Sequence, residues 1–191
     1  MRNEPPAPLR GSPAAPAIPR CAFVTGSRGS GKTRWLQLQI RDLAREHPGA
    51  RCGVVLAEEG RTRMERFSQE TPGVSVRRLL LPCTCCPGLA DLPGALREMV
   101  EVVRPGWVFL EVPSLAAAGF MAEFDRVMGW PRELAVCLDR GWTTALLDDS
   151  LSPFQMALLG LADRVVPCLS PLGSHPGFPG APGPASSNDP A

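Results

Sequence analysis

Lysine is nearly missing from this sequence of 191 residues: Lys32 is the single lysine among 20 basic side chains, and all the others are arginine. Aromatic residues are also scarce, at 6%, and the formal net charge is only +1, with both signs mixed throughout. Proteins that bind nucleic acids usually show a basic stripe or an aromatic-rich platform, and this sequence has neither. We therefore expect no nucleic-acid partner.

Long apolar runs are absent as well. No stretch reaches the ~20 apolar residues that a membrane-spanning helix requires, so we expect no membrane association. The N-terminus lacks the continuous apolar segment of a signal peptide, and we expect a cytoplasmic protein. The cysteines number seven, and an odd number in such a chain favours metal binding or redox chemistry over a disulfide framework.

Proline is concentrated at the two ends of the chain. Residues 1–20 contain six of the 22 prolines and residues 167–191 contain seven, and neither segment shows apolar periodicity. We therefore expect disordered tails over residues 1–19 and 169–191. The intervening residues 20–168 are enough for one domain with its own core.

The only lysine lies in a glycine-rich motif that matches G-x-x-x-x-G-K-[ST] at every fixed position. The motif is Gly26-Ser27-Arg28-Gly29-Ser30-Gly31-Lys32-Thr33. Glycines let backbone amides approach a phosphate, and a following helix would direct its positive end at it. We expect Lys32 to contact the β- and γ-phosphates of a nucleotide and the Thr33 hydroxyl to bind Mg²⁺. A glycine-rich turn without a ligand is the alternative.

The sequence around this motif predicts alternating strands and helices. An apolar run at 21–24 precedes the motif, and apolar residues with helical spacing follow it. Further strands are expected at 51–57, 74–81, 107–110, 143–147 and 164–166, and helices at 92–103, 115–128 and 154–161. Residues 61–72 and 134–138 are ambiguous. The alternation predicts an α/β, three-layer P-loop NTPase fold with a mostly parallel sheet and helices on both faces.

Glu111 is the second candidate for a catalytic role, beside Lys32. It is a lone acid at the end of the apolar strand 107–110, and such strand ends meet the phosphate site in this kind of sheet. We expect Glu111 to hold Mg²⁺ directly or through water. A loop carboxylate without such a role is the alternative.

Three cysteines cluster after the strand predicted at 74–81. Cys83 and Cys85 can share one face of an extended segment, and a turn at Pro87-Gly88 would let Cys86 join them. Three thiolates suit zinc or another transition metal, although zinc would take a fourth ligand. Buried apolar packing or a redox pair are alternatives. The remaining cysteines, which are Cys21, Cys52, Cys137 and Cys168, are expected to pack in or beside strands.

Together these elements resemble the CobW-type P-loop GTPases, relatives of UreG and HypB that are regarded as metallochaperones or metalloenzyme-maturation factors. The resemblance covers about residues 21–168, and its most specific part is the Cys-x-Cys-Cys element joined to a P-loop. Cys83, Cys85 and Cys86 match the metal motif, with Pro82 in place of the usual glycine. The resemblance implies a nucleotide, Mg²⁺, a transition metal and a client metalloenzyme as partners. It leaves the metal, the client and the formation of a homodimer open.

Several positions depart from the family pattern. Ala57 replaces the asparagine of an Asn-Glu-x-Gly segment. Ser114 replaces the glycine of Glu-x-x-Gly, and this second departure implies altered γ-phosphate sensing. The stretch equivalent to the guanine-recognising Asn-Lys-x-Asp reads Cys168-Leu169-Ser170-Pro171. The choice between GTP and ATP therefore does not follow from the sequence. The family's usual C-terminal domain and any histidine-rich metal-storage tract are also not found in this sequence.

The leading hypothesis is a nucleotide-dependent metallochaperone or maturation factor, with slow GTP or ATP hydrolysis. A nucleotide-binding module with little hydrolysis that supports a partner enzyme is a second hypothesis, favoured by the departures at Ser114 and at the guanine motif. A P-loop phosphotransferase with structural cysteines is a third, in which Arg61, Arg63 and Arg66 would form an arginine-rich lid.

Overall fold

Six parallel strands form one sheet in the computed structural model, which describes residues 18–57, 63–79 and 91–167. The strands lie in the order β3-β2-β4-β1-β5-β6, and every pairing between neighbours is parallel. Their bounds are Arg20–Gly26 for β1, Cys52–Leu56 for β2, Val74–Arg78 for β3, Trp107–Glu111 for β4, Arg132–Cys137 for β5 and Arg164–Val166 for β6.

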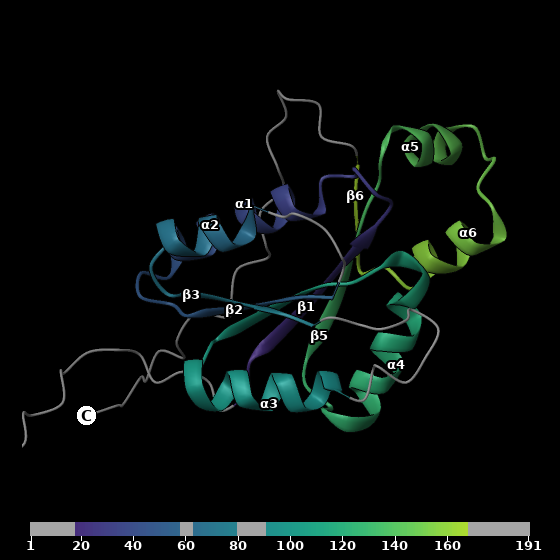
Figure 1. The fold of residues 1–191 in the computed structure, drawn as a ribbon. Coiled ribbons are helices and arrows are strands. Elements are labelled where there is room, and N and C mark those ends of the chain that lie inside the picture. Colours follow the sequence, from purple (N-terminus) through teal and green to yellow (C-terminus); the bar gives the residue numbers. More distant parts are fainter. Residues whose placement is uncertain (1–17, 58–62, 80–90, 168–191) are drawn as a thin grey trace, which may run out of the picture.

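Helices cover both faces of this sheet (Figure 1). The first two helices pack on one face and the next two on the other, while the last two connect β5 to β6. The helices are α1 Lys32–Glu46, α2 Met64–Glu70, α3 Asp91–Val103, α4 Ala117–Val127, α5 Arg140–Leu147 and α6 Pro153–Gly160, and a 3-10 turn, η2 Ser114–Ala116, precedes α4. The predicted three-layer α/β fold is confirmed.

The strands are apolar on both faces because both faces are covered. In β1, Phe23 belongs to the core layer that contains Phe120 and Phe124 of α4. Its neighbour Val24 points the other way and belongs to the layer that contains Trp35 of α1. This alternation with a period of two residues explains why the central strands appear in the sequence as short continuous apolar runs.

The register of the strands brings their carboxyl ends to a common edge. Val24 of β1 is paired with Glu111 of β4, and Gly26 of β1 is paired with Cys137 of β5. On the other side, Leu56 of β2 is paired with both Glu111 and Arg78 of β3. In a sheet of this kind ligands bind outside the carboxyl ends of the strands, so this edge is where a site is expected.

One predicted strand is wrong. Residues 143–147 belong to helix α5, and the ambiguous segment at 134–138 supplies the strand β5 instead. Asp139 starts the helix by accepting a hydrogen bond from the backbone amide of Trp142 at 2.8 Å, as N-cap residues do. Leu147 is 81% exposed, which no buried strand would tolerate. The short apolar run was compatible with either structure, and the cap decides for the helix.

The ambiguous polar segment after residue 60 contains another helix, α2. Only Met64 and Phe67 of α2 are buried, three residues apart on one face, and they pack in the layer of α1. Arg66 lies on its exposed face and forms an ion pair with Glu70 at 2.7 Å. Seven residues with two apolar positions give too weak a periodicity to be recognised in the sequence.

Candidate nucleotide-binding site

The glycine-rich motif forms the turn between β1 and α1. Gly26 ends β1 with φ 144°, and a Cβ atom at this position would lie 2.1 Å from the carbonyl oxygen of Cys137, so only glycine fits. Gly31, with φ 86°, leads into α1. Between them Ser27 is half-buried, whereas Arg28 and Gly29 are exposed. The loop therefore presses against the end of β5 on one side and faces solvent on the other.

The N-terminus of α1 is left without the partners that usually satisfy a helix start. Gly31 has no side chain to cap the helix, and the first turn contains no acidic residue. The first amides of a helix have no partner within the helix, and they attract anions together with the helix dipole. In a helix of 15 residues this end is suited to a phosphate group.

Lys32 lies across the loop. Its ammonium group donates to the carbonyl oxygens of Gly26 at 3.1 Å and Ser27 at 3.0 Å, and the residue is only 5% exposed. A buried ammonium is costly unless it is hydrogen-bonded, and the loop's own carbonyls supply these bonds. The same position lets the ammonium meet phosphate oxygens that enter the loop.

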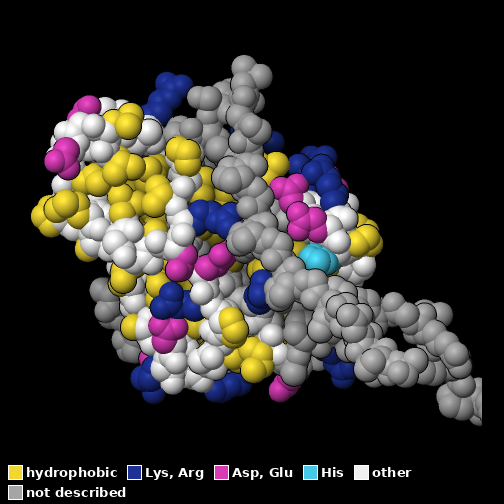
Figure 2. Space-filling view, turned by 180° about the vertical axis from the view of Figure 1, so that it is seen from behind, with side chains coloured by type: hydrophobic (Ala, Val, Ile, Leu, Met, Phe, Trp, Pro, Cys, Tyr) yellow, Lys and Arg dark blue, Asp and Glu magenta, His cyan; other side chains and the backbone are white. Residues whose placement is uncertain are grey.

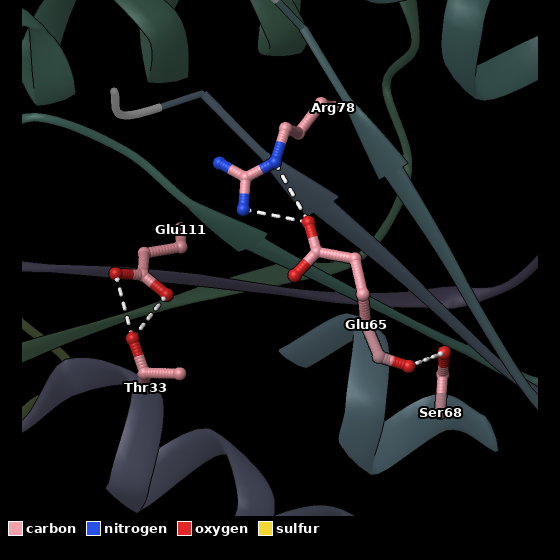
Figure 3. Close-up of polar contacts among 5 residues, drawn as sticks. All are labelled: Thr33, Glu65, Ser68, Arg78 and Glu111. Atoms are coloured by element: carbon pink, nitrogen blue, oxygen red, sulfur yellow. Dashed lines mark hydrogen bonds and ion pairs between the residues drawn. The ribbon is translucent and has the colours of Figure 1, made fainter. Parts of the chain in front are cut away.

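Thr33 and Glu111 face each other at the end of β4 (Figure 3). The Thr33 hydroxyl lies 3.1 Å and 3.0 Å from the two carboxylate oxygens of Glu111, which is 3% exposed. A hydroxyl and a carboxylate are oxygen ligands of the kind that Mg²⁺ prefers, together with phosphate oxygens and water. The two residues lie 78 positions apart in sequence, and the pairing of β1 with β4 brings them together.

A buried hydroxyl in the loop supports the fit of a ligand. Ser30 is 5% exposed, and its Oγ atom has no hydrogen-bond partner among the described residues. Buried polar atoms are nearly always satisfied in native proteins, so an orphan in a phosphate loop indicates a missing partner. The uncapped helix, Lys32, the Thr33–Glu111 pair and this hydroxyl together fit a nucleotide with Mg²⁺.

The segment after Glu111 is held firmly. The amide of Val112 donates to Val24 at 2.9 Å, and the Thr25 hydroxyl donates to the carbonyl of Val112 at 3.0 Å. Ser114 then opens the 3-10 turn η2, which the amide of Ala116 closes on the carbonyl of Pro113 at 3.0 Å. The position where the family pattern has a flexible glycine is thus the first residue of a closed turn.

The predicted metal ligands lie outside the described residues. Cys83, Cys85 and Cys86 follow β3 within the undescribed segment 80–90, as does Pro82. Within residues 18–57, 63–79 and 91–167 no group of three or more potential ligands gathers around a point. The last residue of β3, Arg78, is anchored to α2 by an ion pair with Glu65, with a nitrogen–oxygen distance of 2.6 Å (Figure 3).

Three of the other cysteines are core residues, as the sequence predicts. Cys21, Cys52 and Cys137 are buried, and burial raises the pKa of each thiol to about 12. Metal ligation and nucleophilic reactions use the thiolate, which these sites disfavour strongly. Cys168 lies outside the described residues.

Asp139 is a residue of the site that sequence analysis misses. It follows β5, and its Oδ2 atom accepts a hydrogen bond from the Ser27 hydroxyl of the phosphate loop at 2.5 Å. The pKa of Asp139 is lowered by this bond first and by the backbone amide of Trp142 second. An aspartate directly after an apolar run was the available signal, but only the pairing of β1 with β5 shows which loop it meets.

The fold and the phosphate loop define a P-loop nucleotide-binding domain. Within this class, residues 20–138 match the family described as "CobW/HypB/UreG, nucleotide-binding domain", and the chain belongs to this family. The resemblance inferred from the sequence motifs is confirmed. The Cys-x-Cys-Cys segment lies within the matched range, whereas the stretch equivalent to the guanine motif lies beyond it.

Solved structures with the same fold include the signal recognition particle receptor FtsY from Elizabethkingia anophelis. One FtsY structure superposes with a TM-score of 0.57 at 16% identity, covering 81% of this chain and 52% of FtsY. FtsY in complex with GDP gives a TM-score of 0.55 at 17% identity, covering 78% of this chain and 48% of FtsY. The chain therefore spans about half the length of these structures, and similarity at this level shows the fold alone.

One search and one property of the helices complete the description. Among curated proteins, none matches this chain. Within the described residues, every helix is too short or too polar to cross a membrane.

Proposed function

We propose that this protein is a nucleotide-dependent metallochaperone or metalloenzyme-maturation factor. The observation that supports the proposal most is the phosphate loop, with Lys32 and the Thr33–Glu111 pair, in a domain of the CobW/HypB/UreG family. The cargo would be a transition metal bound by Cys83, Cys85 and Cys86, and the recipient a client metalloenzyme that operates in the cytoplasm.

The nucleotide would be GTP or ATP, with its phosphates in the loop 26–33. Lys32 would exchange the carbonyls of Gly26 and Ser27 for phosphate oxygens, and the Ser30 hydroxyl would gain a partner. Thr33 would hold Mg²⁺, with Glu111 as a direct or water-mediated ligand. When bound, Mg²⁺ neutralises charge on the β- and γ-phosphate oxygens.

The strand register supports communication between nucleotide and metal. β3 ends at Arg78, which pairs with Leu56, and Leu56 also pairs with Glu111. Arg78, the last residue of β3, thus lies at the same edge of the sheet where Glu111 meets Thr33, and Cys83 follows it five positions later in the sequence. In this proposal a change at the γ-phosphate biases the segment that follows β3 between two conformations, which is how nucleotide switches commonly act.

A second candidate is a binding module that hydrolyses nucleotide slowly or not at all. The turn at Pro113 and Ser114 favours it, because a closed 3-10 turn has less freedom to follow the γ-phosphate than a glycine would have. Under this alternative the nucleotide stabilises the fold for a partner enzyme. Tight binding of nucleotide without turnover, and without any effect on metal affinity, would favour this module over the switch.

The metal part is tested by zinc content after purification without chelators. We expect one zinc-like ion per chain, lost when Cys83, Cys85 and Cys86 are all replaced by serine. Replacement of Cys21, Cys52 or Cys137 by serine provides the matched controls, because these thiols are buried and burial raises their pKa, and these variants should keep the ion. Thiolate ligands release protons on binding, so affinity should fall as pH falls. Zinc retained by the triple variant would contradict the proposed ligands.

A further inference from the structure

A hydrogen bond connects the phosphate loop to the start of helix α5. The Ser27 hydroxyl donates to Asp139 Oδ2 at 2.5 Å, although the residues are 112 positions apart in sequence. Gly26 and Cys137 are directly paired in the parallel register of β1 and β5. Ser27 and Asp139 therefore leave the sheet side by side, and the contact is a consequence of the strand pairing.

Asp139 uses both of its carboxylate oxygens. Oδ2 accepts from Ser27, while Oδ1 accepts from the backbone amide of Trp142 at 2.8 Å and caps α5. The backbone carbonyl of Asp139 also accepts from the Thr143 hydroxyl at 2.7 Å. One residue thus holds the phosphate loop with one oxygen and the first turn of α5 with the other.

Ser27 links this contact to the nucleotide-binding lysine. Its backbone carbonyl accepts from Lys32 Nζ at 3.0 Å and from the amide of Ser30 at 3.2 Å. Phosphate oxygens that bind the ammonium would compete with the Ser27 carbonyl for it. A series of hydrogen bonds then runs from the phosphate position through Lys32 and Ser27 to Asp139 and α5.

Helix α5 is well placed to respond because the core holds it only weakly. None of its residues is fully buried, and Trp142 packs edge-to-face on Phe154 of α6, with 6.4 Å between ring centroids. Apolar side chains of α5, α6, β6 and the connection from α6 to β6 remain exposed, on the side of the molecule where Figure 2 shows a broad hydrophobic surface. These side chains are Leu146, Leu147, Phe154, Met156, Leu161 and Val165.

We propose that Asp139 is a positioning residue that orients the phosphate loop through Ser27, and that this contact couples nucleotide binding to the position of α5. The inference rests on the nucleotide binding in the proposed function and is independent of the metal. Coupling between two sites is reciprocal, so weakening the contact should affect both the affinity for nucleotide and the response of α5.

Calorimetric titration with GDP and with a non-hydrolysable GTP analogue, both with Mg²⁺, tests the first half. Ser27→Ala and Asp139→Asn should each weaken binding about fivefold. Asparagine caps helices as well as aspartate does, so Asp139→Asn should leave the start of α5 intact. The double variant should bind nucleotide no more weakly than whichever single variant has the lower affinity. Ser27→Thr keeps the hydroxyl and should bind nucleotide with the affinity of the wild type. Additive losses, or loss in Ser27→Thr equal to that in Ser27→Ala, would overturn the proposal.

Tryptophan fluorescence tests the response of α5. Nucleotide should change the tryptophan emission of the wild-type protein, and it should change the emission of Trp142→Phe less. The difference between these two changes is the component from Trp142. This component should be smaller in Asp139→Asn at saturating nucleotide. Asp148→Asn, which removes the same charge at the exposed far end of α5, is the control and should behave as wild type. A Trp142 component that is absent in the wild type or unchanged in Asp139→Asn overturns the coupling. Failure of the wild type to bind nucleotide at all would instead contradict the proposed function.

Discussion

A single ammonium group occupies the centre of the phosphate loop in a chain that otherwise uses arginine. Lys32 is almost fully buried between the carbonyls of Gly26 and Ser27, where a compact group with three donors fits. A guanidinium is planar and larger, and Arg28 in the same loop is exposed. We expect Lys32 to supply most of the local attraction for phosphate.

Replacing Lys32 with alanine should abolish the stabilisation of the protein by nucleotide. Saturating nucleotide should stabilise the wild type by ~2.7 kcal/mol at a hundredfold excess over the Kd. Thermal unfolding with and without nucleotide measures this difference. Arg45→Ala removes an exposed cation from the far end of the same helix and should keep the full effect. A normal shift in Lys32→Ala would contradict the role of the loop.

Glu111→Gln should reduce the contribution of Mg²⁺ to nucleotide binding. The substitution preserves the shape of a side chain that is 3% exposed but removes the charge beside the Thr33 hydroxyl. Substitution of a residue that ligates or orients a metal ion typically lowers the affinity for the metal by about 10- to 100-fold. Titration of Mg²⁺ at fixed nucleotide measures the loss, with Glu101→Gln on the exposed face of α3 as the control. An unchanged Mg²⁺ requirement would show that Glu111 is not involved.

Local spacing explains which site residues the sequence predicts. The positions of Lys32 and Thr33 are fixed by one continuous motif, and Glu111 is recognisable as an acid that ends an apolar strand. The structure places the Thr33 hydroxyl beside the Glu111 carboxylate, and their binding of Mg²⁺ stays a prediction. Asp139 has no such motif, because its meeting with Ser27 depends on which strand lies beside β1.

Caps decide the structure of the two short helices between β5 and β6. Asp139 caps α5, while Ser152 caps α6 and its backbone amide donates a hydrogen bond to Gln155 Oε1 at 2.8 Å. The capping explains why a helix forms at 143–147, where the apolar pattern alone favours a strand. Apolar periodicity predicts long elements such as α1 and α3 well, but in elements of eight residues the ends matter more.

Asp139→Ala should cost about 1 kcal/mol of stability at neutral pH, through the lost cap. The pKa of Asp139 is lowered in the folded protein, so the ionised carboxylate stabilises the fold above its ordinary pKa of 3.8. This contribution is lost as the pH falls through the lowered value. Urea unfolding measured from about pH 7 to about pH 3 gives the free energy of unfolding of both proteins. The difference in this free energy between wild type and Asp139→Ala should narrow only below pH 3.8.

Ser152→Ala is the matched control for this pH dependence. It removes a cap that carries no charge, and its cost of about 1 kcal/mol should stay constant over the same pH range. A cost for Asp139→Ala that is equally constant would contradict the stabilising role of its charge.

At the scale of the whole molecule, the parallel sheet brings separate segments to one edge. The ends of β1, β4 and β5 position the phosphate loop, Glu111 and Asp139, and β3 ends at the same level at Arg78. The order of elements was sufficient to predict this architecture, because strands that alternate with helices favour a parallel sheet. The neighbours within the sheet were not predictable, since nothing local in a strand specifies its partner.

Because β3 and the phosphate loop end at one edge of the sheet, nucleotide and metal should each change the affinity for the other. This reciprocal effect tests the proposed nucleotide-dependent metal carrier most directly. Zinc binding should be measured by calorimetry without nucleotide and with a non-hydrolysable GTP analogue and Mg²⁺, and analogue binding should then be measured with and without zinc. We predict that each ligand tightens the other by the same factor, as linkage requires, and that the effect disappears when Cys83, Cys85 and Cys86 are serine. If the wild type binds both ligands but neither changes the affinity for the other, the account of a nucleotide-dependent metal carrier is contradicted.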